Sequence, residues 1–227
     1  MRFFPAKVCA AFTVMLGCAV MALAEPATMK VPRTVEPVAL TNVTLLDGPF
    51  RDAMLRDQKY LLALEPDRLL QTFRVNVGLP ASARPYGGWE GPQVEIRGHI
   101  LGHYLSALSL MYASTGDGVF KQRADYIVGE LAVCQSNSTA AGFHTGYLSA
   151  FPESFIDRVE QRKTVWVPWY TLHKIMAGLL DANQLCGNAQ ALTVLTNMAN
   201  WVGFRVDHLP PEQMQKSLDT EHGGMNE

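Results

Sequence analysis

Two stretches of the sequence carry its clearest structural signal, HYLSALSLMYASTGD at residues 103–117 and HKIMAGLLDANQLCGN at residues 173–188. Each begins with a histidine, continues with apolar residues at helical spacing, and ends about a dozen residues later at a turn containing glycine. The segments that follow also compare, since ADYIV at 124–128 matches ANWV at 199–202. A helical hairpin that occurs twice predicts a stacked or closed array of hairpins.

The rest of the sequence extends this helical pattern. Apolar residues at helical spacing follow the turn at 47–49 and follow Pro66, whereas residues 76–93 are rich in glycine and proline and are expected to form a loop. No convincing alternating strand is present, so we predict an all-α fold of about six helices in three hairpins. The further helices are expected at 94–114, 119–134, 169–185 and 189–206.

The predicted array has fewer hairpins than a closed ring. Toroids of helical hairpins commonly use six of them, so three hairpins correspond to about half. The last residues, GGMNE at 223–227, look like the beginning of another helix. An open half-array would expose the apolar side of its last hairpin, which is costly without a cap. We therefore expect the chain to be the N-terminal part of a larger array.

Residues 1–24 have the features of a secretory signal peptide. Arg2 and Lys7 give a positive start, an apolar run covers 8–21, and Ala22-Leu23-Ala24 offers a cleavage pattern of small residues. The run is shorter than the roughly 20 apolar residues of a membrane-spanning helix, which favours cleavage over a retained anchor. A lipoprotein would need lipid on Cys18, after too short an apolar run. We expect export to the periplasm or the cell exterior, followed by an extended lead-in at 25–40.

Charge and cysteine content exclude several classes of partner. The net charge is −2 at pH 7, and no basic cluster indicates nucleic acid or an anionic membrane surface. After signal cleavage no segment is long and apolar enough to cross a membrane. Cys134 and Cys186 lie inside apolar helical patterns and are expected as buried small residues, while their pairing in an oxidising compartment stays open.

Glu95, His99 and His103 recur at every fourth residue and would share one stripe of the expected helix. Three buried ionisable groups need partners, which favours a stripe that faces a ligand cavity. Two alternatives stay open: the histidines and the carboxylate could hold a metal ion, or the histidines could be core or rim residues. Gly98 and Gly102 on the neighbouring stripe would allow another helix to approach closely.

The connection at 135–168 is long for a compact helical array, and such loops are usually functional or disordered. It is rich in aromatic residues, so we expect an ordered loop packed over one end of the array. Aromatic faces beside Glu153, Asp157 and Arg158 suit sugar rings; the alternative is that they only anchor the loop to the core. These residues are Phe143, His144, Tyr147, Phe151, Phe155 and Trp166.

His173 lies one turn into the helix expected from residue 169, at a position that matches His103 in the repeat. Equivalent positions in successive hairpins would point to the same end of the array, so His173 is a candidate ligand-facing residue. Trp169 and Tyr170 fit either a site or the core. The remaining histidines, His144, His208 and His222, have no such support.

Six segments together resemble glycoside hydrolase family 127 and its sibling family 146. The resemblance runs from about residue 40 to the last residue and rests on the ordered set. It implies an (α/α)6 toroid followed by β-sandwich domains, with residues 41–227 as the N-terminal part of the toroid. The segments are LLDGPF (45–50), GGWE (87–90), RGHILGHYLSA (97–107), GYLSAFP (146–152), VPWYTLHK (167–174) and GGMNE (223–227).

The same resemblance implies retaining hydrolysis of β-L-arabinofuranosides from plant-derived glycans. Such enzymes hold a cysteine nucleophile on zinc with further cysteines and a glutamate that also acts as acid/base, and zinc keeps the thiolate deprotonated. The corresponding Glu-x-Cys segment and later cysteines would lie beyond Glu227, and neither Cys134 nor Cys186 matches them. We therefore expect no catalytic residue and no zinc ligand in this chain.

From the resemblance, only the residues that bind the sugar can be transferred to this chain. The expected partner is a carbohydrate. Three hypotheses stay open: the N-terminal part of a glycosidase, a non-catalytic glycan-binding helical protein, and a complete small enzyme built on Glu95, His99 and His103. A carboxylate pair for ordinary glycoside hydrolysis cannot be chosen among Glu90, Glu95, Glu153, Asp157 and Glu227. The candidate sugar-binding residues are Trp89, Glu90, His99, His103, Trp169 and His173.

Overall fold

The computed structural model describes residues 35–221, 224 and 225. The chain divides into two compact units at Pro37. In the first unit, the described residues 35–37 have no regular secondary structure. The second unit, Val38–Glu227, contains the helices described below. The predicted signal peptide lies outside the described residues, as does most of the lead-in predicted at 25–40.

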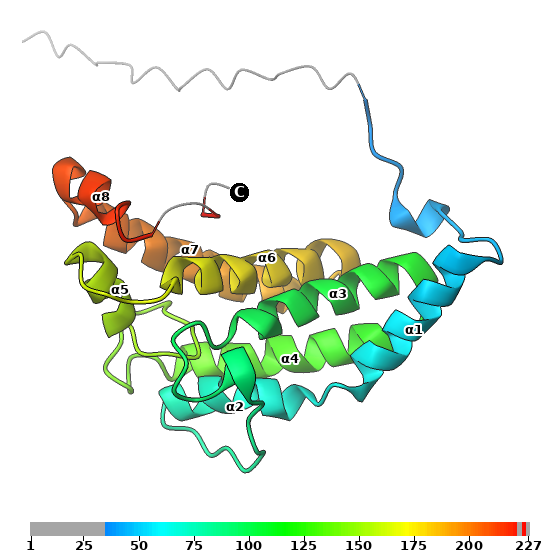
Figure 1. The fold of residues 1–227 in the computed structure, drawn as a ribbon, viewed down its shortest axis with the longest axis horizontal. Helices are drawn as coiled ribbons and strands as arrows, with labels where there is room; N and C mark the ends of the chain where they lie inside the picture. Colours follow the sequence, from blue (N-terminus) through cyan, green and yellow to red (C-terminus); the bar gives the residue numbers. More distant parts are fainter. Residues whose placement is uncertain (1–34, 222–223, 226–227) are drawn as a thin grey trace, which may run out of the picture. The chain divides into compact units, whose positions relative to one another are not determined.

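Six long α-helices form three hairpins in the second unit (Figure 1). The part of the chain that the structure describes contains no β-strand, so the predicted all-α fold is confirmed. None of its helices has the length and apolar character needed to cross a membrane. The hairpins are α1 (Pro49–Ala63) with α2 (Pro66–Asn76), α3 (His99–Thr115) with α4 (Gly118–Ser136), and α6 (Pro168–Cys186) with α7 (Ala189–Asp207). Shorter helices lie in the connections: η1 (Leu40–Asn42), η2 (Gly88–Glu90), α5 (Ser154–Glu160) and α8 (Pro211–Ser217).

The hairpins are arranged in two layers. One layer contains α1, α3 and α6, with α3 and α6 side by side in the most extensive contact between helices (Figure 1). The other contains α2, α4 and α7, and α4 contacts both α2 and α7. Each hairpin therefore contributes one helix to each layer.

Two glycines let α3 and α6 approach at backbone distance. A Cβ atom at Gly102 of α3 would overlap the carbonyl oxygen of Lys174, and a Cβ at Gly178 of α6 would lie 2.5 Å from the carbonyl oxygen of Gly102. Both distances are below van der Waals contact, so these positions require glycine. The close approach predicted from Gly102 is confirmed. Gly98 acts differently, since it precedes the first residue of α3 with φ of 97°.

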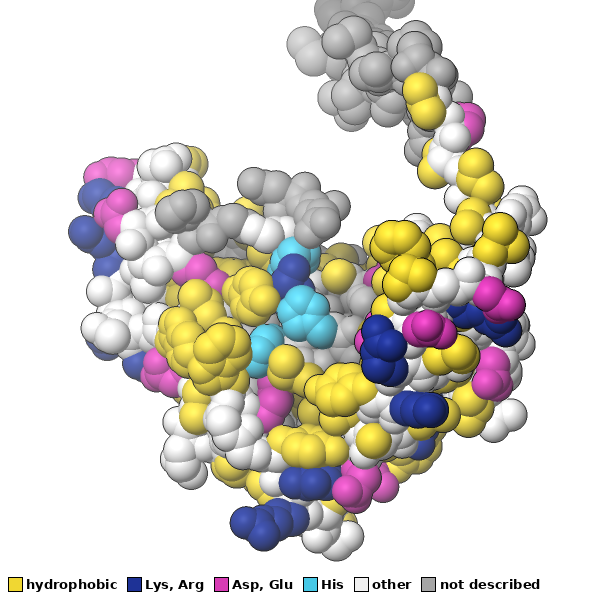
Figure 2. All heavy atoms as spheres, turned by 45° about the vertical axis from the view of Figure 1, so that its right-hand side comes forward, with side chains coloured by type: hydrophobic (Ala, Val, Ile, Leu, Met, Phe, Trp, Pro, Cys, Tyr) yellow, Lys and Arg dark blue, Asp and Glu magenta, His cyan; other side chains and the backbone are white. Residues whose placement is uncertain are grey.

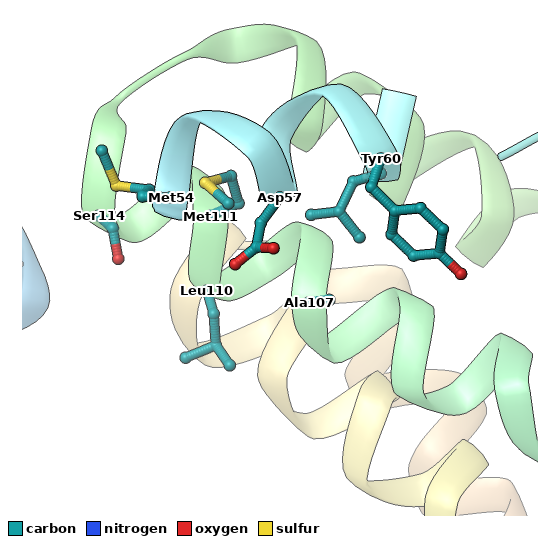
Figure 3. A pocket seen from close by; sticks show the side chains of 8 residues that line it. Met54, Asp57, Tyr60, Ala107, Leu110, Met111 and Ser114 are labelled. Atoms are coloured by element: carbon teal, nitrogen blue, oxygen red, sulfur yellow. The ribbon is translucent and has the colours of Figure 1, made fainter. Parts of the chain in front are cut away.

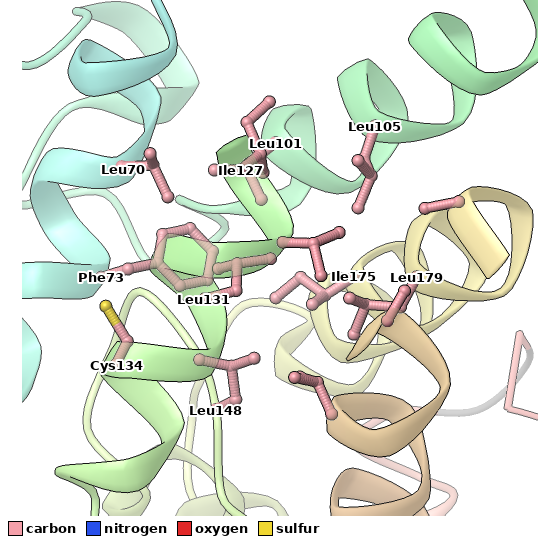
Figure 4. Packing of buried hydrophobic residues seen from close by; sticks show 14 of the residues in the cluster. Leu70, Phe73, Leu101, Leu105, Ile127, Leu131, Cys134, Leu148, Ile175 and Leu179 are labelled. Atoms are coloured by element: carbon pink, nitrogen blue, oxygen red, sulfur yellow. The ribbon is translucent and has the colours of Figure 1, made fainter. Parts of the chain in front are cut away.

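The hydrophobic core fills the space between the two layers (Figure 4). Phe73 of α2, Leu105 of α3, Leu131 of α4 and Ile175 of α6 are fully buried there. Burial of this apolar surface is the main force that holds the hairpins together, at roughly 1.5–3 kcal/mol for each large side chain.

Both described cysteines are free and buried. Cys134 lies in α4 and Cys186 is the last residue of α6. Burial raises the pKa of Cys134 to about 12 and also raises the pKa of Cys186, so both remain thiols at neutral pH. The expectation of two buried, unpaired cysteines is confirmed.

The turns that join α3 to α4 and α6 to α7 are built alike. The first helix of each of these hairpins, α3 or α6, ends at a glycine with left-handed backbone, Gly116 with φ of 71° or Gly187 with φ of 67°. The next residue caps the following helix: Asp117 accepts the backbone N–H of Val119, and Asn188 accepts that of Ala191. These matching turns confirm the internal repeat.

The start of α3 differs from the prediction. The helix begins at His99 rather than at 94, because residues 95–98 form turns and Gly98 has a left-handed backbone. Glu95 is therefore not on the helix, and the predicted stripe of Glu95, His99 and His103 does not form. The short helices α5 and α8 were not predicted, since seven residues give too little periodicity to identify a helix.

The long connection is ordered and packs against α7. Tyr147 and Phe151 are fully buried. The buried carboxylate of Glu153 accepts the backbone N–H of His144 at 2.9 Å and the indole N–H of Trp201 in α7 at 2.8 Å. The prediction of an ordered loop is confirmed. For Tyr147 and Phe151 the anchoring alternative holds, because their rings lie in the core.

Candidate functional site

Aromatic and histidine rings gather where α3 and α6 begin. The centroid of His99 lies 6.0 Å from Trp89, 6.1 Å from His103 and 6.1 Å from Tyr170, and Trp89 lies 6.1 Å from Trp166. We call these five residues the aromatic cluster. Trp89 is 62% exposed and Trp166 is 42% exposed. Figure 2 shows histidine side chains grouped beside hydrophobic ones on this face.

A buried carboxylate fixes the first turn of α3. Glu90 of η2 accepts the backbone N–H of Gly98 at 2.7 Å and that of Ile100 at 3.0 Å. Its Oε1 atom also lies 2.9 Å from Nδ1 of His99. The first N–H groups of a helix have no partner within the helix and carry partial positive charge, so a carboxylate there is stabilising. Glu90 thereby links the loop that carries Trp89 to the helix that carries His99 and His103.

A second buried carboxylate does the same for α6. Glu221 accepts the backbone N–H of Trp169 at 2.9 Å and that of Tyr170 at 2.7 Å. Burial raises the pKa of Glu221, against the opposing effect of these two hydrogen bonds. Glu221 could not be predicted as a site residue, because no local pattern in the sequence connects it to a helix that begins some fifty residues earlier.

Glu95 contacts the segment that carries Trp166 of the aromatic cluster. It accepts a hydrogen bond from Nη1 of Arg158 at 2.7 Å and from the backbone N–H of Trp166 at 2.8 Å. The carboxylate therefore fixes the backbone of Trp166. Because Glu95 is committed to these partners and lies outside the helix, the structure does not support a metal site made of Glu95, His99 and His103.

His103 is the exposed histidine of the cluster. Its Nε2 atom lies 3.2 Å from the hydroxyl oxygen of Tyr170. Partial burial lowers the pKa of His103, and the positive charge of Lys174 lowers it further. The ammonium of Lys174 lies 5.2 Å from the ring centroid of Tyr170. His103 is thus held in its neutral form, able both to donate and to accept a hydrogen bond.

His173 and His103 are not equivalent, contrary to the predicted match. His103 is exposed, whereas His173 is buried against Gly224, where a Cβ atom would lie 2.5 Å from the His173 Nδ1 atom. Gly116 follows α3 and Gly187 follows α6. His173 lies one residue further from Gly187 than His103 lies from Gly116. One residue rotates a side chain by about 100°, which separates their environments. Both lie near the same end, since His173 affects the pKa of His103.

The candidate residues thus divide into two groups. The structure brings Trp89, Glu90, His99 and His103 together, and adds Trp166 and Tyr170. Trp169 is placed differently: its ring lies 5.9 Å from that of Trp201, packed against the core. Trp166 was predicted only as one of the aromatic residues of the long connection. Nothing in the sequence indicated that its ring lies beside that of Trp89.

The chain is thus an all-helical array of hairpins with exposed tryptophans and histidine rings where α3 and α6 begin. A family model described as beta-L-arabinofuranosidase, GH127 catalytic domain, matches residues 42–227. The chain belongs to this family of arabinofuranosidase-like glycoside hydrolases. Its three hairpins form about half of an (α/α)6 toroid. No curated protein matches the chain significantly.

Family membership implies zinc, and the described residues do not fit a zinc site. Cys134 and Cys186 lie in the core as thiols with raised pKa values, whereas zinc requires thiolates. Across residues 35–221, 224 and 225, no three His, Cys, Asp or Glu side chains are grouped so that they could hold a metal ion. The aromatic cluster therefore offers stacking surfaces and hydrogen bonds, but no metal ligand set.

Proposed function

We propose that this chain is the sugar-binding part of a β-L-arabinofuranosidase and that the aromatic cluster binds the sugar. The observation that carries the proposal is the pair of exposed rings, Trp89 and Trp166, beside neutral His103. Exposed apolar side chains grouped on one surface often mark a binding site. Glu95 accepts the backbone N–H of Trp166, and Glu90, the residue after Trp89, accepts the backbone N–H of Gly98 before α3.

The chemistry of the cluster suits a small polyhydroxylated ring. Indole faces pack on the C–H groups of a sugar, and hydroxyl groups need donors and acceptors around the edge. His103, Tyr170 and Lys174 supply both kinds of group within one patch. An L-arabinofuranoside at the end of a plant-type glycan is the substrate that fits the family. Plant glycans occur outside the cell, so the proposal includes export through the signal peptide at 1–24.

The bond-breaking groups belong, in this proposal, to a part of the toroid outside this chain. Furanoside hydrolysis by this family needs a nucleophile and an acid/base, and both described thiols are buried in the core. Apolar surface is also exposed between α1 and α3. Tyr60 of α1 and Leu110 of α3 are exposed and line an apolar pocket of ≈ 260 Å³ between these helices (Figure 3). Further hairpins of a complete toroid would extend over this inner face.

The second candidate function is a non-catalytic glycan-binding protein. The same two buried thiols favour it, because a sugar site without a nucleophile can bind but cannot hydrolyse. An assay with an aryl β-L-arabinofuranoside in the presence of zinc bears on both candidates. We expect no turnover by this chain alone. Zinc-dependent turnover that is lost in Glu95→Gln or His103→Ala would support a complete enzyme instead.

Binding is tested by calorimetric titration of the chain with methyl β-L-arabinofuranoside. We expect Trp89→Ala to weaken binding by roughly fivefold, from the loss of about 1 kcal/mol of stacking. Tyr60→Ala is the matched control, since Tyr60 is also an exposed aromatic residue (65%) but lies in the pocket between α1 and α3. Equal binding by Trp89→Ala and the wild type would contradict the proposal.

A further inference from the structure

His99 is the most buried ring of the aromatic cluster, at 3% exposure. Its Nδ1 atom lies 2.9 Å from the carbonyl oxygen of Ile96 and 2.9 Å from Oε1 of Glu90. A carbonyl oxygen can only accept a hydrogen bond, and an ionised carboxylate likewise only accepts. Nδ1 must therefore donate its proton to the Ile96 carbonyl oxygen, while the Glu90 carboxylate lies at ion-pair distance from the same atom. In the neutral ring, this places the proton on Nδ1 and leaves a lone pair on Nε2.

The Nε2 atom of His99 is free to act as an acceptor. It makes no hydrogen bond with another residue in the part of the chain that the structure describes, and it is not a buried atom. The rings of Trp89, His103 and Tyr170 lie 6.0–6.1 Å from the His99 ring, measured between centroids. The lone pair therefore belongs to the surface formed by the aromatic cluster.

Glu90 is placed to act through His99 rather than to contact a ligand itself. It is 7% exposed. Its Oε2 atom accepts the Gly98 N–H, and its Oε1 atom accepts the Ile100 N–H while also facing His99 Nδ1. The two backbone donors and the buried position leave little accepting capacity for a sugar hydroxyl. The negative charge of Glu90 beside Nδ1 favours a proton on that atom.

We propose that His99 Nε2 accepts a hydrogen bond from a hydroxyl group of the bound sugar, and that Glu90 is a positioning residue that fixes this tautomer together with the Ile96 carbonyl. The identity of the ligand rests on the proposed function. The tautomer does not, because it follows from the contacts of Nδ1 alone. In many metal sites a carboxylate beside one ring nitrogen of a histidine orients the ring, and the other nitrogen binds the metal. Here the other nitrogen, Nε2, would contact a sugar hydroxyl instead.

The tautomer is measured by ¹⁵N NMR of the uniformly labelled full chain at pH 8, without ligand. We expect His99 to show a protonated, pyrrole-type Nδ1 and an unprotonated, pyridine-type Nε2. A ring with the proton on Nε2, averaged signals from two exchanging tautomers, or a doubly protonated ring would each overturn the proposal. Such states would leave no stable lone pair on Nε2.

The role of Glu90 is separated from simple helix capping by a matched pair of variants. Glu90→Gln and Glu221→Gln each alter a buried carboxylate that caps a helix of this site. We expect only Glu90→Gln to shift the Nδ1–H signal of His99 toward that of a weaker hydrogen bond. If Glu90→Gln leaves that signal unchanged, Glu90 only caps α3 and its positioning role is overturned.

The acceptor role is tested by two substitutions of His99. His99→Asn keeps a polar group near the position of Nδ1 but has no atom at that of Nε2, whereas His99→Gln can place an amide oxygen there. We expect His99→Asn to weaken binding of methyl β-L-arabinofuranoside by roughly fivefold to tenfold, the effect of one lost hydrogen bond. His99→Gln should recover most of the affinity. The control is His208→Asn, an exposed histidine at the end of α7.

The outcomes distinguish this proposal from the proposed function. If the wild type binds the sugar but His99→Asn binds equally well, or His99→Gln binds no better than His99→Asn, the acceptor role fails while the proposed function stands. If the wild type does not bind the sugar at all, the proposed function fails and the acceptor role fails with it.

Discussion

Lys174 is the charged residue that acts most strongly on His103 in the aromatic cluster. Partial burial lowers the pKa of His103, and Lys174 is the next largest cause. Because the folded pKa lies below the unfolded value near 6.5, the unfolded chain takes up a proton first as the pH falls. Protonation of His103 therefore works against folding below about pH 6.5. His103 is therefore a neutral imidazole at neutral pH.

Replacement of Lys174 gives a prediction with a definite sign. Lys174→Met removes a positive charge beside His103, so the pKa of His103 should rise, as measured by NMR titration. Lys216→Met is the control, since Lys216 is exposed on α8 and pairs with Glu212. An unchanged or lower pKa of His103 in Lys174→Met would show that the lysine does not act on the cluster.

Some residues of the candidate site could be predicted from the sequence, and others could not. Trp89, Glu90, His99 and His103 are close in sequence, so one motif-rich segment indicated all four. Glu221 and Trp166 join the site only through contacts with distant segments, Glu221 with the start of α6 and Trp166 with Glu95. Trp169 was misleading because periodicity places it on a helix but cannot say whether its ring faces Trp201 or the site.

Among the elements, the contact between α3 and α6 is the most sensitive to change. Gly102→Ala would place a methyl group against the Lys174 backbone, which cannot yield as a flexible side chain would. We expect a loss of roughly 1–3 kcal/mol in the free energy of unfolding, or more, measured by urea denaturation. The cluster should be disturbed too, because both helices carry its residues.

Gly129→Ala is the matched control for that substitution. Gly129 lies within α4, and a Cβ atom there meets nothing within 4 Å. Alanine in a helix interior is more favourable than glycine by roughly 0.5–1 kcal/mol, so this variant should be slightly more stable than the wild type. Equal effects of the two substitutions would contradict the close packing of α3 on α6.

The long connection depends on the buried carboxylate of Glu153. It accepts hydrogen bonds from His144 and Trp201 and lies 3.3 Å from Nη1 of Arg205. Glu153→Gln would leave Arg205 without part of its buried counter-charge, at a cost of roughly 2–4 kcal/mol in unfolding free energy. Hydrogen exchange should speed up at the His144 amide. Glu212→Gln, at an exposed pair, should change neither quantity.

The helical elements themselves were largely predictable, for a physical reason. Each long helix has an apolar stripe of sufficient length, and each hairpin turn after α3 and α6 has a glycine followed by a capping Asp or Asn. The start of α3 was misjudged because the apolar pattern continues through residues 94–98, while the left-handed backbone of Gly98 ends it. Backbone conformation at one glycine is not visible in periodicity.

For the whole molecule, the two-layered array separates two surfaces. The aromatic cluster lies where α3 and α6 begin, and the apolar pocket of Tyr60 and Met111 lies further along α3, against α1 (Figure 3). The first has exposed tryptophans, neutral His103 and buried carboxylates, whereas the second is lined mainly by apolar side chains. The account assigns the sugar to the first surface and leaves the second for packing against further parts of a toroid.

The measurement that tests this assignment most directly is an NMR titration of the labelled chain with methyl β-L-arabinofuranoside. The account predicts saturable shifts of the indole N–H signals of Trp89 and Trp166 and of the His103 ring, with the signals of Tyr60 and Met111 unchanged. Shifts confined to Tyr60 and Met111, or no saturable shift at Trp89, would contradict the claim that the aromatic cluster is the sugar-binding site.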